Sequence, residues 1–147
     1  MRRRSSLPRS AQNTVMDLLA RREHSEKELR RKLRLREFSE DEISTALEKA
    51  KEGRWLGSPE ETAQRFADQL HRKNKGYHYI NGKLAEKGLP RVPRDESLEL
   101  EKAKSLVQNK DFEISSREER LKATRFLMSR GFDASTIRKA LKDEEEL

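Results

Sequence analysis

The sequence predicts an all-α protein, an elongated tandem array of three-helix repeats in which the second repeat is shortened. Three observations support this prediction. Apolar residues recur at the helical spacing i, i+3, i+4 and i+7 in one segment after another. Several of these segments begin at a Ser followed three residues later by a Glu, which is typical of a helix start. In addition, part of the chain repeats at a constant offset of 94 residues.

Apolar stripes and start signals predict eight helices, in chain order at residues 11–22, 25–36, 40–52, 59–74, 77–87, 95–109, 116–130 and 134–143. The stripe residues, in the same order, include Ala11–Val15–Leu18, Ile43–Ala46–Leu47, Ala63–Phe66–Ala67, Tyr77–Ile80–Leu84, Leu100–Ala103–Val107 and Ala134–Ile137–Leu141. The second helix is predicted from its start signal. The seventh has two competing stripes, both left open by the sequence: Leu121–Thr124–Met128 and Ala123–Phe126–Leu127.

The helix starts carry capping signals. In a capping box the Ser side chain and the Glu side chain each accept a hydrogen bond from the other's backbone N–H. The candidate boxes are Ser25–Glu28, Ser39–Glu42, Ser58–Glu61 and Ser116–Glu119. Asp133 can cap the last helix. Pro90 and Pro93 interrupt the chain between the fifth and sixth helices.

An internal repeat groups these helices into units of about 45 residues, each of which must stack on its neighbours to bury its apolar stripe. The aligned positions, 94 residues apart, are Leu33, Phe38, Ile43 and Leu47 with Leu127, Phe132, Ile137 and Leu141. A related turn occurs at Leu89. We expect the turn residues Phe38, Leu89 and Phe132 to enter the cores of their repeats. Gly131 is expected to end its helix with a positive φ.

The predicted organisation has five parts. They are a loose basic arm at residues 1–10, a first repeat at 11–56, a second at 57–96, a third at 97–143 and a loose acidic tail at 144–147. Only 13 residues separate Leu89 from Ala103. We therefore expect the third helix of the second repeat to be missing or fused into the next helix.

Composition excludes several functional classes. The 147 residues include no Cys, which rules out disulfides and zinc–thiolate sites and fits a reducing, cytoplasmic setting. No apolar run approaches the length of a membrane span. The sequence has no HExxH metal motif and no glycine-rich phosphate loop, so we expect no enzyme, no cofactor and no metal. There is no long heptad seam, and a monomer is expected.

Positive charge is concentrated in the first two thirds of the chain. Residues 21–36 carry eight Lys and Arg against three Glu, and residues 65–94 carry eight against two acidic residues. Such a surface attracts nucleic acid or an acidic protein, although it is also compatible with a solvated helix face. Tyr79 follows basic residues, as aromatic residues do at single-stranded nucleic-acid sites. The candidate contact residues are Arg21, Arg22, Lys27, Arg30, Arg31, Arg34, Arg65, Arg72, Lys73, Lys75 and Tyr79.

Several short motifs occur in a fixed order across residues 11–142. They are the run Leu18–Leu33, then Arg65-Phe66-Ala67, Lys75-Gly76, Ile80, Leu84, Lys87-Gly88-Leu89, Phe126-Leu127, Arg130-Gly131-Phe132 and Ile137. In order and spacing this set resembles the RecX family of bacterial regulators of the RecA recombinase. One departure is the stretch Trp55–Glu60, where the family usually has an acidic pair just before its second repeat.

The resemblance implies a modulator that lodges in the groove of the RecA filament on single-stranded DNA. Such a protein would limit recombinase, ATPase and coprotease activity in homologous recombination, DNA repair and the SOS response. The residues themselves leave two alternatives, a helix-turn-helix-like DNA-binding protein and a helical scaffold for another acidic protein. Glu40-Asp41-Glu42 at the start of one candidate recognition helix disfavours the first alternative, because phosphates would repel these side chains.

Overall fold

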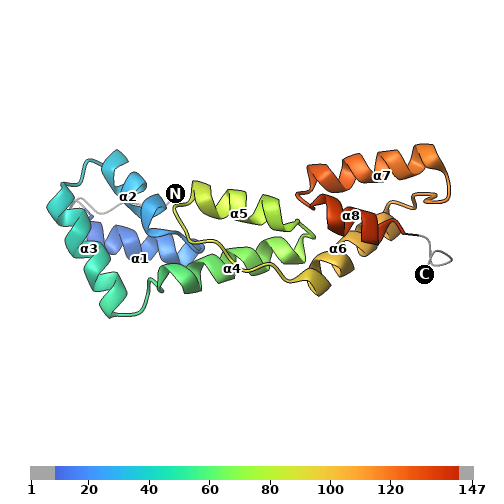
Figure 1. The fold of residues 1–147 in the computed structure, drawn as a ribbon. Coiled ribbons are helices and arrows are strands. Elements are labelled where there is room, and N and C mark those ends of the chain that lie inside the picture. Colours follow the sequence, from blue (N-terminus) through green and yellow to red (C-terminus); the bar gives the residue numbers. More distant parts are fainter. Residues whose placement is uncertain (1–8, 143–147) are drawn as a thin grey trace. The chain divides into compact units, whose positions relative to one another are not determined.

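The computed structural model describes residues 9–142, which form eight α-helices and no strand (Figure 1). The helices are α1 Ala11–Arg21, α2 Glu26–Leu35, α3 Glu40–Glu52, α4 Pro59–Arg72, α5 Tyr77–Glu86, α6 Glu96–Asn109, α7 Arg117–Ser129 and α8 Ala134–Ala140. The all-α prediction is confirmed, and every predicted helix is present with its ends within three residues. The acidic tail and residues 1–8 of the basic arm lie outside the described residues.

Side-chain capping explains why the helix starts could be read from the sequence. At α2, Ser25 Oγ accepts a hydrogen bond from Glu28 N–H, and the Glu28 carboxylate accepts one from Ser25 N–H, both at 3.1 Å. Ser39 and Ser58 make the same reciprocal pairs with the Glu three residues later. At α7, Ser116 Oγ accepts from the backbone N–H three residues on, at 3.4 Å. These bonds satisfy donors that a helix leaves unpaired at its start.

Two further caps were not predicted. Ser10 Oγ accepts from Asn13 N–H at 3.1 Å and begins α1. Asp95 accepts from Leu98 N–H at 3.0 Å and begins α6. Asp95 was expected to be the first residue of that helix. The structure places it instead at the N-cap, where its negative charge interacts favourably with the helix dipole.

The chain divides into two compact units. The first unit comprises the described residues up to Arg65 together with Lys87–Pro90, and the second comprises Phe66–Glu86 and the residues from Arg91 onward. The first turns of α4 therefore belong to the first unit, and its last turns belong to the second. This division cuts through the predicted second repeat, and the repeat boundaries at residues 57 and 96 stay a prediction.

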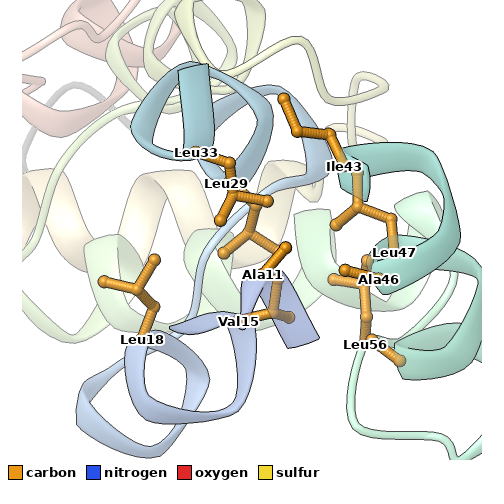
Figure 2. Close-up of a cluster of buried hydrophobic side chains, with 10 residues drawn as sticks. Ala11, Val15, Leu18, Leu29, Leu33, Ile43, Ala46, Leu47 and Leu56 are labelled. Carbon is orange, nitrogen blue, oxygen red and sulfur yellow. The ribbon is translucent and has the colours of Figure 1, made fainter. Parts of the chain in front are cut away.

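Three helices enclose the core of the first unit. The buried residues come from α1, α2 and α3, with Leu56 from the segment that follows, and Phe38 packs against them while remaining partly exposed. Figure 2 shows these side chains converging: Ala11, Val15, Leu18, Leu29, Leu33, Ile43, Ala46, Leu47 and Leu56. Leu29 and Leu33, one helical turn apart, are fully buried, which fixes the face that α2 presents to solvent.

A second core lies between α6, α7 and α8. Its buried residues are Ala103, Leu106, Val107, Ala123, Leu127, Phe132, Ile137, Ala140 and Leu141. Phe132, from the turn between α7 and α8, is 3% exposed and lies in this core. Of the two stripes predicted for α7, the one with Ala123 and Leu127 faces inward, while Leu121 and Met128 are exposed.

The shortened second repeat has two helices, α4 and α5. Residues 87–95 contain no helix, and whether the third helix of this repeat is missing or fused into α6 stays a prediction. Asn81 on α5 holds this connection in the second unit, because its Oδ1 accepts a hydrogen bond from Val92 N–H at 2.9 Å. Val92 is 8% exposed and, with Ile80 and Leu84, supplies buried apolar area to this part of the unit.

Two turns of the second unit meet backbone to backbone. Gly76 N–H donates to the Arg130 carbonyl at 2.8 Å, and His78 N–H donates to the Gly131 carbonyl at 3.0 Å. Gly131 has φ +94°, and a Cβ at this position would lie 2.5 Å from the Cβ of Tyr79. The equivalent turn residue in the first repeat is Glu37, which also has a positive φ, of 66°. Because Glu37 tolerates a positive φ, the φ angle alone does not require glycine at 131. The close contact with α5 does, since it leaves no room for a Cβ.

Candidate interaction surface

Helix α2 presents its basic residues to solvent. Its capping box sets where the helix begins, and its buried stripe of Leu29 and Leu33 turns the remaining faces outward. Lys27 and Arg34 are exposed, and Arg30 is half-buried. These three residues follow the i, i+3, i+7 spacing of one helix face. These three cations thus form a strip along α2.

This strip borders a cavity of about 540 Å³ within the first unit. The rim carries four cationic side chains, from Lys27, Arg30 and Arg34 on α2 and from Lys51 on α3. The remaining lining residues are Glu26, Leu56, Gly57, Ser58, Pro59, Thr62, Gly88 and Leu89. We call the four cations with the cavity they surround the basic hollow. Leu89 was expected to enter the core of its repeat; it is instead half-buried and lines this hollow.

One carboxylate lies among the four cations. Glu26 contacts Lys51 at 2.5 Å and Arg30 at 3.7 Å. The hydrogen bond from Lys51 is the main cause that lowers the pKa of Glu26 below its ordinary value. On the outer side of the strip, Arg34 pairs with Glu40 at 2.7 Å. Exposed pairs of this kind contribute only about 0–1 kcal/mol, so an external anion can compete for the cations.

A buried hydroxyl adds a polar group to the wall of the basic hollow. Thr62, in the first turns of α4, is 2% exposed, and its Oγ1 has no hydrogen-bond partner among the described residues. A buried hydroxyl without a partner is unusual and costs about 1–3 kcal/mol. The lining of the hollow therefore combines positive charge, the apolar residues Leu56, Pro59 and Leu89, and a buried threonine.

Other predicted contact residues are engaged within the first unit. Arg22 pairs with Glu28 at 2.8 Å, and Lys87 approaches the same carboxylate at 3.4 Å. Burial alone would raise the pKa of Glu28, but the bonds from Arg22 and the Ser25 backbone and the charge of Lys87 outweigh it and lower the pKa to about 2. Arg65 pairs with Glu23 at 3.0 Å. Arg22 and Arg65 thus hold elements of this unit in place.

Arg21 and Arg31 are exposed, and neither lines the basic hollow.

The buried His24, in the turn before α2, accepts a hydrogen bond from Lys32 Nζ at 2.8 Å, and its Nδ1 lies 3.0 Å from the Arg22 carbonyl. This arrangement requires a neutral imidazole with its proton on Nδ1.

The remaining candidates belong to the second unit. Arg72 and Lys73 are exposed at the end of α4. The half-buried ring of Tyr79 lies under two ammonium groups, with Lys75 Nζ 4.7 Å and Lys83 Nζ 5.6 Å from its centroid. These cation–π contacts occupy the ring within the unit.

Lys51 was missed by sequence reasoning. Its only signal was its place in the last turn of a predicted helix, which does not reveal which neighbouring helix it faces.

Among the described residues, no helix is long and apolar enough to cross a membrane.

The fold and this surface define a tandem three-helix-repeat protein with a cationic face on its first repeat. Sequence profiles for the first and the third three-helix domain of RecX match residues 11–49 and residues 96–141. The chain belongs to the RecX family.

Proteins that are similar to this one over most of its length carry the same family name. The protein is 35% identical over 141 residues to regulatory protein RecX of Pseudomonas fluorescens (strain SBW25), covering 90% of both chains. It is 33% identical to regulatory protein RecX of Stenotrophomonas maltophilia (strain K279a), covering 86% of this chain and 82% of that one. The protein is accordingly a regulatory protein of this family.

A solved structure supports the fold. The crystal structure of RecX from Lactobacillus salivarius superposes with a TM-score of 0.79 at 21% identity, covering 93% of this chain and 96% of that one.

Proposed function

We propose that the protein binds the RecA filament on single-stranded DNA in the cytoplasm and limits its recombinase, ATPase and coprotease activity. Membership of the RecX family supports this role in DNA repair and the SOS response. The observation that carries the proposal is the basic hollow, where four cations from α2 and α3 surround one carboxylate. The proposal involves no catalytic step by this chain.

The basic hollow suits a filament partner for a physical reason. A filament of protein on DNA presents many phosphates and carboxylates, and a positive surface accelerates encounter with such a target. Lys27, Arg30 and Arg34 extend from a single helix anchored in the core, so little conformational entropy of the backbone is lost on binding.

Charge reversal tests this assignment. A variant with Lys27→Glu, Arg30→Glu and Arg34→Glu should bind the RecA filament at least tenfold more weakly at physiological salt, because repulsion replaces attraction at the rim. Binding would be measured by the change in mass on immobilised filaments. Far-ultraviolet circular dichroism should show unchanged helix content, because these side chains contribute little to the core.

A matched control separates a specific surface from net charge. Lys49, Lys104 and Lys139 are exposed on other helices, and their reversal to Glu changes the net charge of the chain by the same amount. This control should retain filament binding. Equal weakening by both triple variants would show that overall charge matters and that the basic hollow is not the contact. Binding of naked single-stranded DNA, measured in parallel, distinguishes contact with DNA from contact with RecA.

A further inference from the structure

Helix α7 carries apolar residues on two faces. Ala123 and Leu127 are fully buried in the core of the second unit. Leu121 and Met128, on a different face, are 50% and 63% exposed, and half-buried Thr124 lies between them at helical spacing. The inner stripe, together with the partly buried Phe126, packs α7 against the core of the second unit. The outer stripe therefore needs a separate explanation, since exposed apolar residues that gather in one patch mark interaction sites.

Thr124 and Met128 of the outer stripe form one wall of a groove. A cavity of about 730 Å³ lies between Thr124 and Met128 on α7 and the residues of α8. Its floor contains Phe132, Ile137 and Leu141, which are 3–5% exposed. We call this cavity the α7–α8 groove. An apolar groove between two helices is a form of surface that binds amphipathic helices.

The rim of the α7–α8 groove is positively charged. Arg120, Arg138 and Lys142 line it, and the latter two are exposed. The acidic lining residue is Asp133, whose carboxylate pairs with Arg94 at 2.7 Å and caps α8 through Thr136 N–H at 2.9 Å. Because Asp133 is already neutralised within the unit, the cations at the rim remain to attract an acidic ligand.

The internal repeat shows that this surface differs from the basic hollow. At the offset of 94 residues, the positions of Leu121, Thr124 and Met128 on α7 correspond to those of the three cations along α2: Lys27, Arg30 and Arg34. The same helix face is therefore cationic in the first repeat and apolar in the third.

We propose that the α7–α8 groove binds an acidic amphipathic α-helix of a partner protein. The apolar stripe of that helix packs between Met128 and Ile137, and its carboxylates face Arg120, Arg138 and Lys142. This mode buries apolar side chains in a preformed groove and obtains specificity from the charged rim. The proposal is independent of the basic hollow and of the function proposed above.

The test uses the full chain labelled with ¹⁵N and a synthetic helical peptide of 14 residues. The peptide carries Leu at i, i+3, i+4 and i+7 and Glu at its outer positions. Saturable changes of amide resonances should concentrate in residues 117–142. Met128→Glu and Arg138→Glu should each weaken binding at least tenfold. Leu35→Glu, a control at a side chain 71% exposed on α2, should leave binding unchanged.

Several outcomes would overturn the proposal. They are an absence of saturable binding, resonance changes centred outside residues 117–142, and equally tight binding of a peptide with Lys in place of Glu. Dimerisation that Met128→Glu abolishes would assign the groove to a second copy of the chain. Binding that emerges only after removal of residues 143–147 would assign it to the chain's own acidic segment.

Discussion

Two histidines, the buried His24 and the half-buried His71, accept hydrogen bonds from lysines. Lys32 Nζ donates to His24 at 2.8 Å, and Lys102 Nζ donates to His71 at 2.8 Å. A protonated imidazole has no acceptor nitrogen, so the structure holds both rings in the neutral form. Burial is the largest cause that lowers the pKa of each ring, and for His71 the charge of Lys102 lowers the pKa further.

These histidines make stability depend on pH. In the unfolded chain each His titrates near its ordinary pKa of 6.5, while in the folded protein the pKa lies lower. The unfolded state therefore binds protons first, and stability is lost as the pH falls below about 6.5. The melting temperature should be lower at pH 5.5 than at pH 7.5, by ~4 °C for each ~1 kcal/mol lost.

The pH effect can be assigned to the histidines by substitution. A variant with His24→Gln and His71→Gln keeps a hydrogen-bond acceptor at both sites and should show a flatter profile between pH 7.5 and 5.5. Glu28 does not contribute in this range, because its pKa falls from 4.5 to about 2 on folding and its stabilisation is lost only below pH 4.5. An unchanged slope in the variant would contradict the assignment.

A second residue-scale prediction concerns the buried pair of Glu99 and Lys102. Both side chains are 3% exposed and lie 2.5 Å apart, and Lys102 also donates to the Lys75 carbonyl at 2.6 Å. Lys102→Met should cost about 3–5 kcal/mol, because it leaves a buried carboxylate without its counter-ion. Adding Glu99→Gln should recover part of this loss. Urea unfolding measures both, and strictly additive effects would contradict the coupling.

At the scale of elements, the packing of α5 on the turn before α8 depends on glycine. A Cβ at Gly76 would lie 2.5 Å from the backbone carbon of Gly131, whereas a Cβ at Gly82, in the middle of α5, would meet no atom within 4 Å. The two glycines lie only six residues apart in the chain, but only the one at 76 has no room for a Cβ.

Alanine at these two positions should have opposite effects. Gly76→Ala should destabilise the protein by more than about 1–3 kcal/mol, since the backbone of the facing turn must move. Gly82→Ala should stabilise it by about 0.5–1 kcal/mol, because alanine favours a helix interior. Thermal unfolding of both variants compares them directly. Similar effects of the same sign would show that the turns do not meet as described.

Helix positions were predictable because their signals are local. The boxes at Ser25, Ser39 and Ser58 need only residues within one turn, and they form as expected. Contacts between distant residues were not predictable. Lys102 sits beside an apolar stripe and resembles any solvated lysine until His71 and Glu99 come from elsewhere in the chain to surround it.

The candidate surface was predictable only where its signals are local, within one helix. The helical spacing of Lys27, Arg30, Arg31 and Arg34 placed them on or beside one face of a predicted helix. The sequence could not show that Lys51 and Leu89 complete the basic hollow, or that Arg22 and Arg65 pair with glutamates. It also left two stripes open for α7, because both have helical spacing and only packing decides which one faces inward.

At the scale of the whole molecule, each unit has its own core and its own surface. The first unit carries the basic hollow and the second carries the apolar α7–α8 groove. Repeats with one fold and different outer residues allow a single chain to engage chemically different sites.

The RecA ATPase on single-stranded DNA, measured while this protein is added at substoichiometric ratios, tests the central claim most directly. The account predicts a fall in ATPase that additional free DNA does not reverse, because the protein acts on the filament. An unchanged ATPase on fully assembled filaments would contradict the account, and the RecX fold would then be present without the proposed inhibition of RecA.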